Sequence, residues 1–211
     1  MPVPDPVWLY HITHINNLTA IIRTGGLLAH NGVDDAYTDI AHQTIQNRRN
    51  NTPVPCTPGG QLHDYVPFYF CRRSPMLYAI HKGNIETYQG GQESIVYLAT
   101  TLVRVQQSGI PFVFTDGHAI MQFSEFYNDP VNLDKIDWEL MKAQYWADTD
   151  DDPDRKRRRQ AEFLLYEKCP WPLIAGIATI DEAMKARVEM LITYEQCTHL
   201  PRVKVKRDWY Y

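Results

Sequence analysis

The chain has 211 residues, of which 44% are hydrophobic and 12% aromatic, and its formal net charge at pH 7 is −4. This length and composition predict one folded domain over residues 1–211 and argue against a disordered chain. No stretch approaches 18 continuous apolar residues, and the first residues lack the basic and apolar regions of a secretory signal. We therefore expect a cytoplasmic protein that does not cross a membrane.

The pattern of apolar, proline and glycine residues predicts alternating strands and helices. In the first half of the chain we expect a strand at 8–11, a helix capped by Asn16 or Asn17 and ended by Gly25–Gly26, a helix over 40–49, a loop over 50–60, an edge or irregular strand at 64–71 containing Pro67, and a helix from Ser74–Pro75 to Gly83. In the second half we expect strands at 94–99, 111–115, 174–180 and 202–206, with helices at 101–108 and 181–195. Without regular βαβ units, this order predicts an α+β domain.

The most unusual stretch is 148–166, where five acids precede five consecutive basic residues and an apolar run follows. A charged loop that places one acid, Glu162, at the start of an ordered element could grip a polyanion beside a carboxylate. The alternative is a solvated surface helix whose charges pair with one another. Asp152–Pro153 can start a helix that runs to Tyr166, or that helix can end near Gln160 and a strand can begin at Glu162; local pattern leaves both open.

Other basic residues are also clustered, at 48–49, 72–73 and 202–207, so the charge distribution permits binding to DNA or RNA. The four cysteines and eight histidines show no metal-ligand spacing; His11 and His14 lie close together, but no acid follows at ligand distance. We therefore expect reduced cysteines and no metal. The glycines form neither a dinucleotide-binding fingerprint nor a P-loop, and no serine hydrolase elbow is present.

Several segments together resemble the DarT family of bacterial DNA ADP-ribosyltransferase toxins, and they follow one another over nearly the whole chain. The segments are LYHITHINNLTAIIRTGGLLAH, IQNRRN, GGQLHDYVPFYFCRRSPMLYAI, PFVFTDGHA, IDWELMKAQYWADTDDDPDRKRRRQAEFLLY and DWYY. The resemblance implies a PARP/ART-like ADP-ribosyltransferase fold, with two small sheets around an NAD cleft and flanking helices. It also implies that Glu162 begins a strand, after a substrate-recognition region over 118–162.

The resemblance assigns a role to each matching position. It implies that Glu162 and Arg49 are catalytic and that NAD, the co-substrate, is bound by His11, Ile12, Thr13, Ala20, Leu28, Arg49, Tyr69 and Met76. From the residues alone, His11 is a partly buried strand end, Ala20 and Leu28 are plain core, and Met76 is as easily core as ligand contact. A guanidinium such as that of Arg49 suits a diphosphate, because its planar fork binds two oxygens.

We further expect DNA to lie along the recognition region. The residues expected to contact it are His118, Tyr145, Trp146, Arg155, Arg157, Arg158, Arg159, Arg72 and Arg73, which offer cations for phosphates and rings for unpaired bases. The QAE strand start and the preceding acidic DPD stretch are closest to the thymidine-modifying branch of the family. The expected activity is transfer of ADP-ribose from NAD to N3 of thymidine in single-stranded DNA, and the expected partner is a macrodomain antitoxin. The alternatives are an ADP-ribosyltransferase acting on RNA or protein, and a nucleic-acid-binding module without activity.

Overall fold

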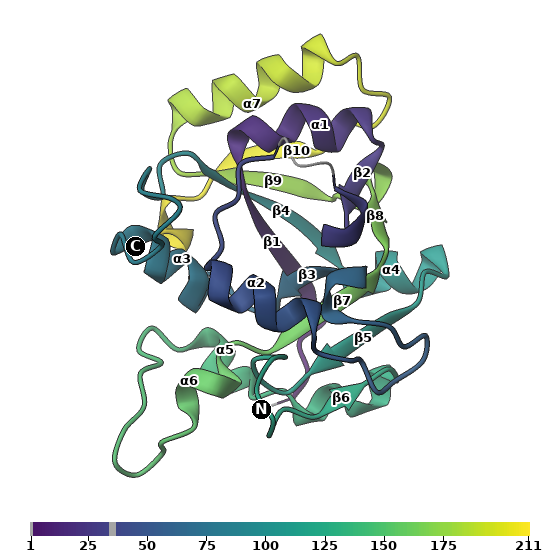
Figure 1. The fold of residues 1–211 in the computed structure, drawn as a ribbon. Coiled ribbons are helices and arrows are strands. Elements are labelled where there is room, and N and C mark those ends of the chain that lie inside the picture. The colour runs from purple at the N-terminus through teal and green to yellow at the C-terminus, as the bar shows by residue number, and fades with distance from the viewer. Residues whose placement is uncertain (1, 34–36) are drawn as a thin grey trace.

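The computed structural model describes residues 2–33 and 37–211 (Figure 1). Within these residues the strands are β1 (Trp8–His14), β2 (Gly26–Leu28), β3 (Tyr65–Tyr69), β4 (Ile95–Thr101), β5 (Phe112–Thr115), β6 (Phe126–Tyr127), β7 (Glu162–Tyr166), β8 (Lys168–Pro170), β9 (Gly176–Thr179) and β10 (Arg202–Val205). The α-helices are α1 (Leu18–Arg23), α2 (Gln43–Asn50), α3 (Pro75–His81), α4 (Leu102–Ser108), α5 (Trp138–Lys142), α6 (Arg155–Arg158) and α7 (Glu182–Tyr194). The 3₁₀ helices are η1 (Ile15–Asn17), η2 (His30–Gly32), η3 (Leu62–Asp64), η4 (Pro130–Lys135), η5 (Trp171–Leu173) and η6 (Arg207–Trp209).

The strands form one large sheet, in the order β10-β9-β4-β1-β3-β7-β5-β6, and a small sheet of β2 and β8. The resemblance implied two small sheets, whereas the structure has one sheet of eight strands and one of two. The large sheet nevertheless consists of two four-stranded halves, since β1 and β3 are matched only at Tyr10 and Tyr69. In contrast, β1 pairs with β4 along its whole length, from Trp8 to His14. The weak pairing therefore divides the sheet between β1 and β3, one strand away from β7.

Pro67 lies at this division. It was predicted to mark an edge or an irregular strand, and the edge interpretation is wrong because β3 lies between β1 and β7. Proline has no N–H to donate, so a regular ladder on both sides of β3 is impossible. The ladder is complete only toward β7, where Pro67 is matched with Leu164. On the other side, the Pro67 carbonyl lies 2.8 Å from Nδ1 of His11.

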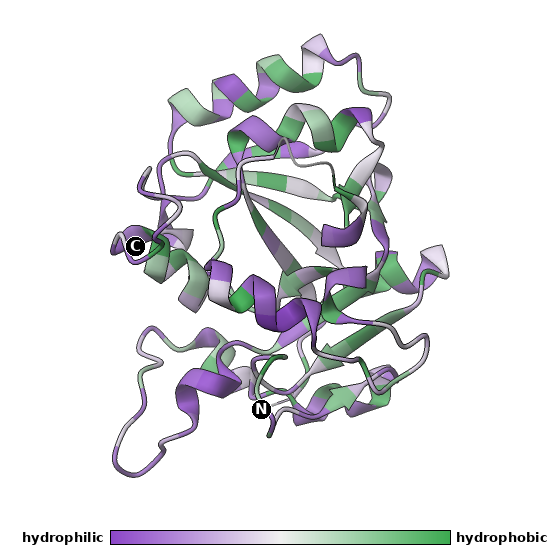
Figure 2. Cartoon of the chain, viewed as in Figure 1, coloured by the Kyte–Doolittle hydropathy of each residue, from purple (hydrophilic) through white to green (hydrophobic). Residues whose placement is uncertain are grey.

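The ambiguous segment at 152–166 resolves into a short helix and a strand. Helix α6 ends at Arg158, and β7 begins at Glu162 between β3 and β5. Phe163, Leu164 and Leu165 are fully buried, so pairing with two neighbouring strands outweighs the helix propensity of the sequence. The loop before α6 extends away from the sheets (Figure 1), and it is mostly hydrophilic (Figure 2).

Local sequence signals predicted most of the longer helices, but one of the two expected N-caps makes no capping hydrogen bond. Ser74 accepts a hydrogen bond from the backbone of Leu77 at 3.2 Å, as an N-cap serine should. Asn17 precedes α1, but its side chain makes no capping bond to that helix. Its amide instead donates to Thr13 Oγ1 at 3.1 Å and to the Thr38 carbonyl at 3.0 Å. Asn17 therefore joins β1 to the segment before α2.

The main apolar core lies between the large sheet and the helices α1 and α7. It contains Leu9 of β1, Leu98 of β4 and Phe163 of β7, together with Leu18 of α1 and Val188 of α7. The two helices lie side by side over the half of the sheet that holds β9 and β10 (Figure 1). This packing fixes the strands that carry the polar residues described below.

Gly26 joins the small sheet to the rest of the fold, and we expect its substitution to be destabilising. Its φ is +149°, and a Cβ atom there would lie 2.8 Å from Pro170 Cα and overlap the Cys169 carbonyl. Gly26→Ala should therefore lower the free energy of unfolding by about 3 kcal/mol, measured by urea denaturation. Gly109→Ala is the matched control: its φ is +70° and no atom of the described residues lies within 4 Å of a new Cβ, so the loss should be about 1 kcal/mol. Equal losses in the two variants would contradict this account.

Candidate active site

Glu162 is the first residue of β7, and it is buried one strand away from the division of the large sheet. Only 3% of it is exposed, and its register partner on β3 is Tyr69. A buried carboxylate is costly unless cations and hydrogen-bond donors surround it. The surroundings of Glu162 therefore define the site.

Arg49, near the end of α2, forms an ion pair with this carboxylate. Its Nη1 atom lies 2.7 Å from Oε2 of Glu162, and Arg49 is 8% exposed. Its Nη2 atom is buried and has no hydrogen-bond partner among the described residues. A buried guanidinium with free N–H groups can bind a further oxygen-rich or anionic group.

The turn after β5 supports the other side of Glu162. The Ala119 backbone N–H donates to Oε1 of Glu162 at 3.1 Å, and the Glu162 N–H donates to Thr115 Oγ1 at 3.2 Å. Thr115 in turn donates to the Gly117 carbonyl at 2.6 Å. Thr115, Gly117 and Ala119 were not predicted as functional, although all of them lie in the quoted segment PFVFTDGHA. A backbone N–H leaves no residue-type signal, so the sequence could not single out Ala119.

The charges around Glu162 keep it ionised at neutral pH. Burial alone would raise the pKa of this carboxyl, but the Arg49 guanidinium, His118 and the Ala119 N–H together hold it below its usual value. Nε2 of His118 lies 4.0 Å from Oε1 of Glu162. Burial lowers the pKa of His118, the Glu162 charge opposes this, and the net shift is downward, so the imidazole is neutral at pH 7. At Tyr69, burial and then the Glu162 charge raise the phenol pKa.

The predicted NAD-binding residues of β1 lie in the sheet next to these groups. His11 is half-buried, and because a carbonyl can only accept, its Nδ1 must donate to Pro67. Its Nε2 is therefore an acceptor, and burial lowers the His11 pKa despite that hydrogen bond. Thr13 is buried and accepts from Asn17. Ile12 contributes its backbone opposite Tyr97.

The remaining positions predicted to bind NAD lie on different elements. Ala20 on α1 is exposed and Leu28 on β2 is half-buried, so the interpretation of both as plain core is wrong. Met76 on α3 is half-buried and packs against a second apolar cluster that includes Tyr10. Their role in binding NAD stays a prediction.

In the basic segment, Arg158 and Arg159, both predicted to contact DNA, already have partners within the protein. Arg158 pairs with Asp137 at 2.5 Å and with Asp152. Arg159 is only 3% exposed, and it donates to the backbone carbonyls of Leu140, Ala143 and Arg72. The alternative of cross-paired charges thus describes this segment well, but on a loop and a single helical turn rather than on a long helix.

Arg155 lies 4.0 Å from Asp152 and is partly accessible, with 28% of its side chain exposed. It donates to the carbonyls of Tyr145 and Ala147 at 2.9 and 3.1 Å. The Tyr145 ring is 80% exposed, whereas Trp146 is half-buried and donates to the Tyr211 hydroxyl at 3.2 Å. Tyr145 therefore offers the open ring surface that base stacking needs.

Arg72 and Arg73 lie beside the aromatic residues at the end of the chain. The Arg72 guanidinium is 5.4 Å from the Trp209 ring, and that of Arg73 is 5.5 Å from the Tyr211 ring. Arg72 also reaches Asp208 at 3.9 Å with half of its side chain exposed. Their contact with DNA stays a prediction.

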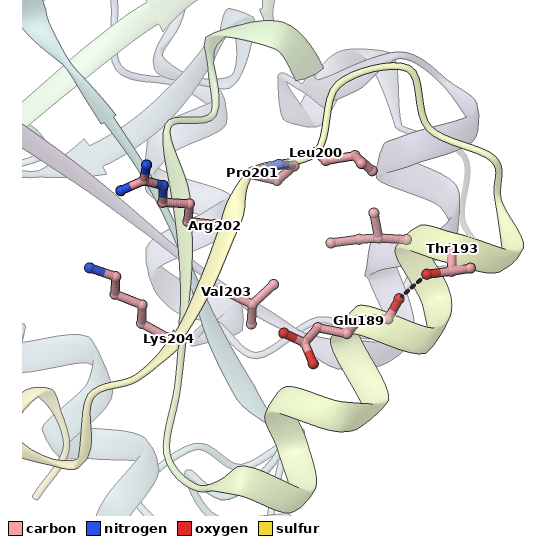
Figure 3. A pocket seen from close by; sticks show the side chains of 8 residues that line it. Glu189, Thr193, Leu200, Pro201, Arg202, Val203 and Lys204 are labelled. Carbon is pink, nitrogen blue, oxygen red and sulfur yellow. Dashed lines mark hydrogen bonds between the residues drawn. The ribbon is translucent and has the colours of Figure 1, made fainter.

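The described residues contain no group of three side chains that could hold a metal ion, and none of their helices is long and apolar enough to cross a membrane. A surface hollow lies between α7 and β10, lined by Glu189, Val203 and Lys204 among others (Figure 3). It contains none of the residues predicted to be functional.

A divided sheet that carries a buried glutamate paired with an arginine fits the ADP-ribosyltransferase class that the sequence resemblance implied. A solved structure of Thermus sp. 2.9 DarT in complex with ADP-ribosylated ssDNA superposes with a TM-score of 0.96 at 46% identity, covering 100% of this chain and 99% of that one. Its complex with NAD+ gives a TM-score of 0.91 at 44% identity, covering 100% of both chains. The predicted fold is thereby confirmed.

Sequence comparison gives the same answer. The family profile described as "ssDNA thymidine ADP-ribosyltransferase, DarT" matches residues 10–211. A DNA ADP-ribosyl transferase from Thermus sp. (strain 2.9) is 47% identical over 208 residues, covering 99% of this chain and 98% of the relative. This chain belongs to the DarT family, as its sequence segments indicated.

Proposed function

We propose that this protein is a DNA ADP-ribosyltransferase that transfers ADP-ribose from NAD to thymidine in single-stranded DNA. The observation that carries the proposal is the ionised, buried Glu162 held by Arg49 at 2.7 Å. Membership of the DarT family and the similarity to a relative solved with NAD+ and with ADP-ribosylated ssDNA support it.

The residues present fit NAD as the co-substrate. The free Nη2 of Arg49 can bind an oxygen of the diphosphate or of the ribose next to the nicotinamide. His11 offers an acceptor nitrogen to ribose hydroxyls, and Thr13 has a hydroxyl proton to donate. NAD supplies the ADP-ribosyl group and nicotinamide leaves.

Glu162 acts on the ribose. Cleavage of the bond between nicotinamide and C1′ develops positive charge on the sugar, as in glycoside hydrolysis. A carboxylate that accepts a hydrogen bond from the ribose 2′-hydroxyl stabilises this charge more in the transition state than in the ground state. The low pKa of Glu162 suits this role, because only the anion can provide the stabilisation.

The acceptor is an unpaired thymine, whose N3 forms the new bond to C1′. N3 is occupied by pairing in a duplex, so the base must be unpaired to react. The N3–H proton is released to water as the N3–C1′ bond forms and the C1′–nicotinamide bond breaks, and the Arg49 charge favours the base anion. Arg49 is not the proton acceptor in this scheme, because a guanidinium resists deprotonation.

The DNA strand is proposed to follow the recognition region over 118–162, within one catalytic domain spanning residues 1–211. Tyr145 and His118 would stack on bases, and Arg155, Arg72 and Arg73 would contact phosphates. The proposed setting is the bacterial cytoplasm, and the proposed partner is a macrodomain antitoxin that removes the modification; the support for the antitoxin is the family resemblance.

The acceptor can be tested directly. We expect that purified protein incubated with labelled NAD labels single-stranded oligonucleotides that contain thymidine, and that mass spectrometry places ADP-ribose on thymine. The same sequence in a duplex should be labelled far less, and a matched oligonucleotide without thymidine should not be labelled. Transfer to guanine, or only to RNA or protein pools, would refute the proposed acceptor. If the protein does not bind NAD in calorimetry, it is a binding module and the proposed enzymatic function is wrong.

A further inference from the structure

Arg157 lies in the basic segment that was expected to bind phosphate, but its guanidinium is fully engaged within the protein. Nε and Nη2 bind the two carboxylate oxygens of Asp154 at 2.7 and 2.8 Å. Nη1 binds Asp116 at 3.0 Å and Ser124 at 3.2 Å, and Nη2 also reaches Asp116 at 3.4 Å. An arginine has five N–H donors, and these contacts use all of them.

The same side chain lies directly against the turn that follows β5. A Cβ atom added to Gly117 would lie 3.0 Å from both Cγ and Cζ of Arg157, and it would overlap Nη1. The His118 backbone N–H donates to the Arg157 carbonyl at 3.0 Å. The Ser124 hydroxyl, which accepts a hydrogen bond from Arg157 Nη1, donates to the His118 carbonyl at 2.8 Å. Arg157 therefore holds residues 116–124 through both its side chain and its backbone.

That turn contacts the reacting carboxylate. The Ala119 N–H lies 3.1 Å from Oε1 of Glu162, and the Gly117 carbonyl accepts from Thr115, which in turn accepts the Glu162 N–H. Only 14% of the Arg157 side chain is exposed, compared with 28% for Arg155 in the same basic run. A displacement of the turn would thus move the hydrogen bonds that orient Glu162.

We infer that Arg157 is a positioning residue, which aims the Glu162 carboxylate by bracing the turn 116–124 from the DNA-recognition region, and that it does not bind a DNA phosphate. This inference deepens the proposed function and rests on it. It also links the segment expected to bind DNA to the carboxylate through one side chain. Two carboxylates next to Arg157 already neutralise its charge, which further reduces its attraction for phosphate.

Conservative substitution distinguishes bracing from phosphate binding. Lysine keeps the charge but cannot reproduce the planar fork. We expect Arg157→Lys to lower kcat on the order of 100-fold, as a small misplacement of a reacting group does, while KM for a thymidine oligonucleotide changes less than about twofold. The slope of log affinity against log salt should stay at the wild-type value. A phosphate contact predicts the opposite: Arg157→Lys would keep kcat, and Arg157→Ala would raise KM and reduce the salt slope by about one.

Two further variants change residues of the turn that contact the Arg157 side chain. Asp116→Asn retains the shape of the side chain and removes one anion, so a phosphate-binding Arg157 should then bind DNA more tightly, whereas a bracing Arg157 should lose kcat. Gly117→Ala changes no charge and should lower kcat without altering the salt slope. These two variants decide the question if Arg157→Lys does not fold, which thermal unfolding would reveal.

Controls separate this inference from the proposed function. Lys185→Ala removes a partly exposed cation on α7 and should match the wild type in both kcat and KM. Arg155→Ala should raise KM and lower the salt slope, because the Arg155 side chain is 28% exposed and that of Arg157 only 14%. If the variants of Arg157, Asp116 and Gly117 retain wild-type kcat on thymidine oligonucleotides, the inference is wrong although the proposed function stands. If the wild type does not modify these oligonucleotides, the proposed function itself fails.

Discussion

Replacing Glu162 by alanine or glutamine should reduce turnover about 10⁴-fold, the largest effect expected for any single side chain of this protein. The anion facing the ribose is lost, and with it the stabilisation of the positive charge that develops as nicotinamide leaves. Glutamine tests the charge alone, because it keeps the shape and one hydrogen-bond acceptor. Single-turnover formation of ADP-ribosylated oligonucleotide, measured by mass spectrometry at saturating NAD, gives the rate.

Two measurements make this result specific. Calorimetry with a non-hydrolysable NAD analogue should give nearly the wild-type affinity for Glu162→Gln, because the carboxylate acts mainly in the transition state. Glu182→Gln, at an exposed position on α7, is the matched control and should keep full turnover. Near-wild-type turnover in Glu162→Ala would remove the central assignment. Both substitutions leave Arg49 buried without its anion, so the melting temperature must be recorded as well.

Substitution of Arg49 should give the second largest effect and should also change the pH dependence. We expect Arg49→Ala to lower turnover about 10³-fold, because it removes the cation that faces the carboxylate and, in our scheme, the ionised base. The remaining carboxylate stays buried, so its pKa should rise above the wild-type value. The acid limb of the kcat/KM profile should therefore move to higher pH. Arg49→Lys should retain part of the turnover and part of the depression of the Glu162 pKa.

The free energy of unfolding should depend on pH through the same Arg49–Glu162 ion pair. The folded-state pKa of Glu162 is depressed, so its contribution is present above the unfolded pKa and is lost as pH falls through the folded pKa. Unfolding of the wild type between pH 7 and pH 3 should show this loss, and Arg49→Ala should lose the contribution at higher pH. Arg23→Ala, which breaks an ion pair in which the Arg23 side chain is 62% exposed, should leave both pH profiles unchanged. An unshifted acid limb in Arg49→Ala would contradict the pairing.

Most elements of the fold were predictable, because their signals are local. Ser74 before Pro75 located α3, and Gly25–Gly26 marked the end of α1. The strand at Glu162 was not locally predictable, since arginine-rich sequence favours helix and only the neighbours β3 and β5 make it a strand. The joining of the two halves into one large sheet was not predicted, because the single match between β1 and β3 depends on packing across the whole molecule.

For the site, the sequence segments identified the charged side chains but not their supports. Glu162 and Arg49 form an ion pair, and His118, which was expected to contact DNA, lies beside Glu162. Residue type could not show that Ala119 would contribute a backbone N–H, or that Arg158 and Arg159 would be held by acids and carbonyls. A run of arginines looks the same whether its partners are phosphates or its own carboxylates. Only the folded arrangement separates the two.

The end of the large sheet at β10 bears on how copies of this protein behave at high concentration. An unpaired strand invites the same strand of another copy to extend the sheet, which leads to aggregation. Here that strand follows Pro201 and carries Arg202 and Lys204 (Figure 3), so two copies that approach edge to edge bring like charges together. The charges on the edge strand β10 therefore oppose self-association through strand addition.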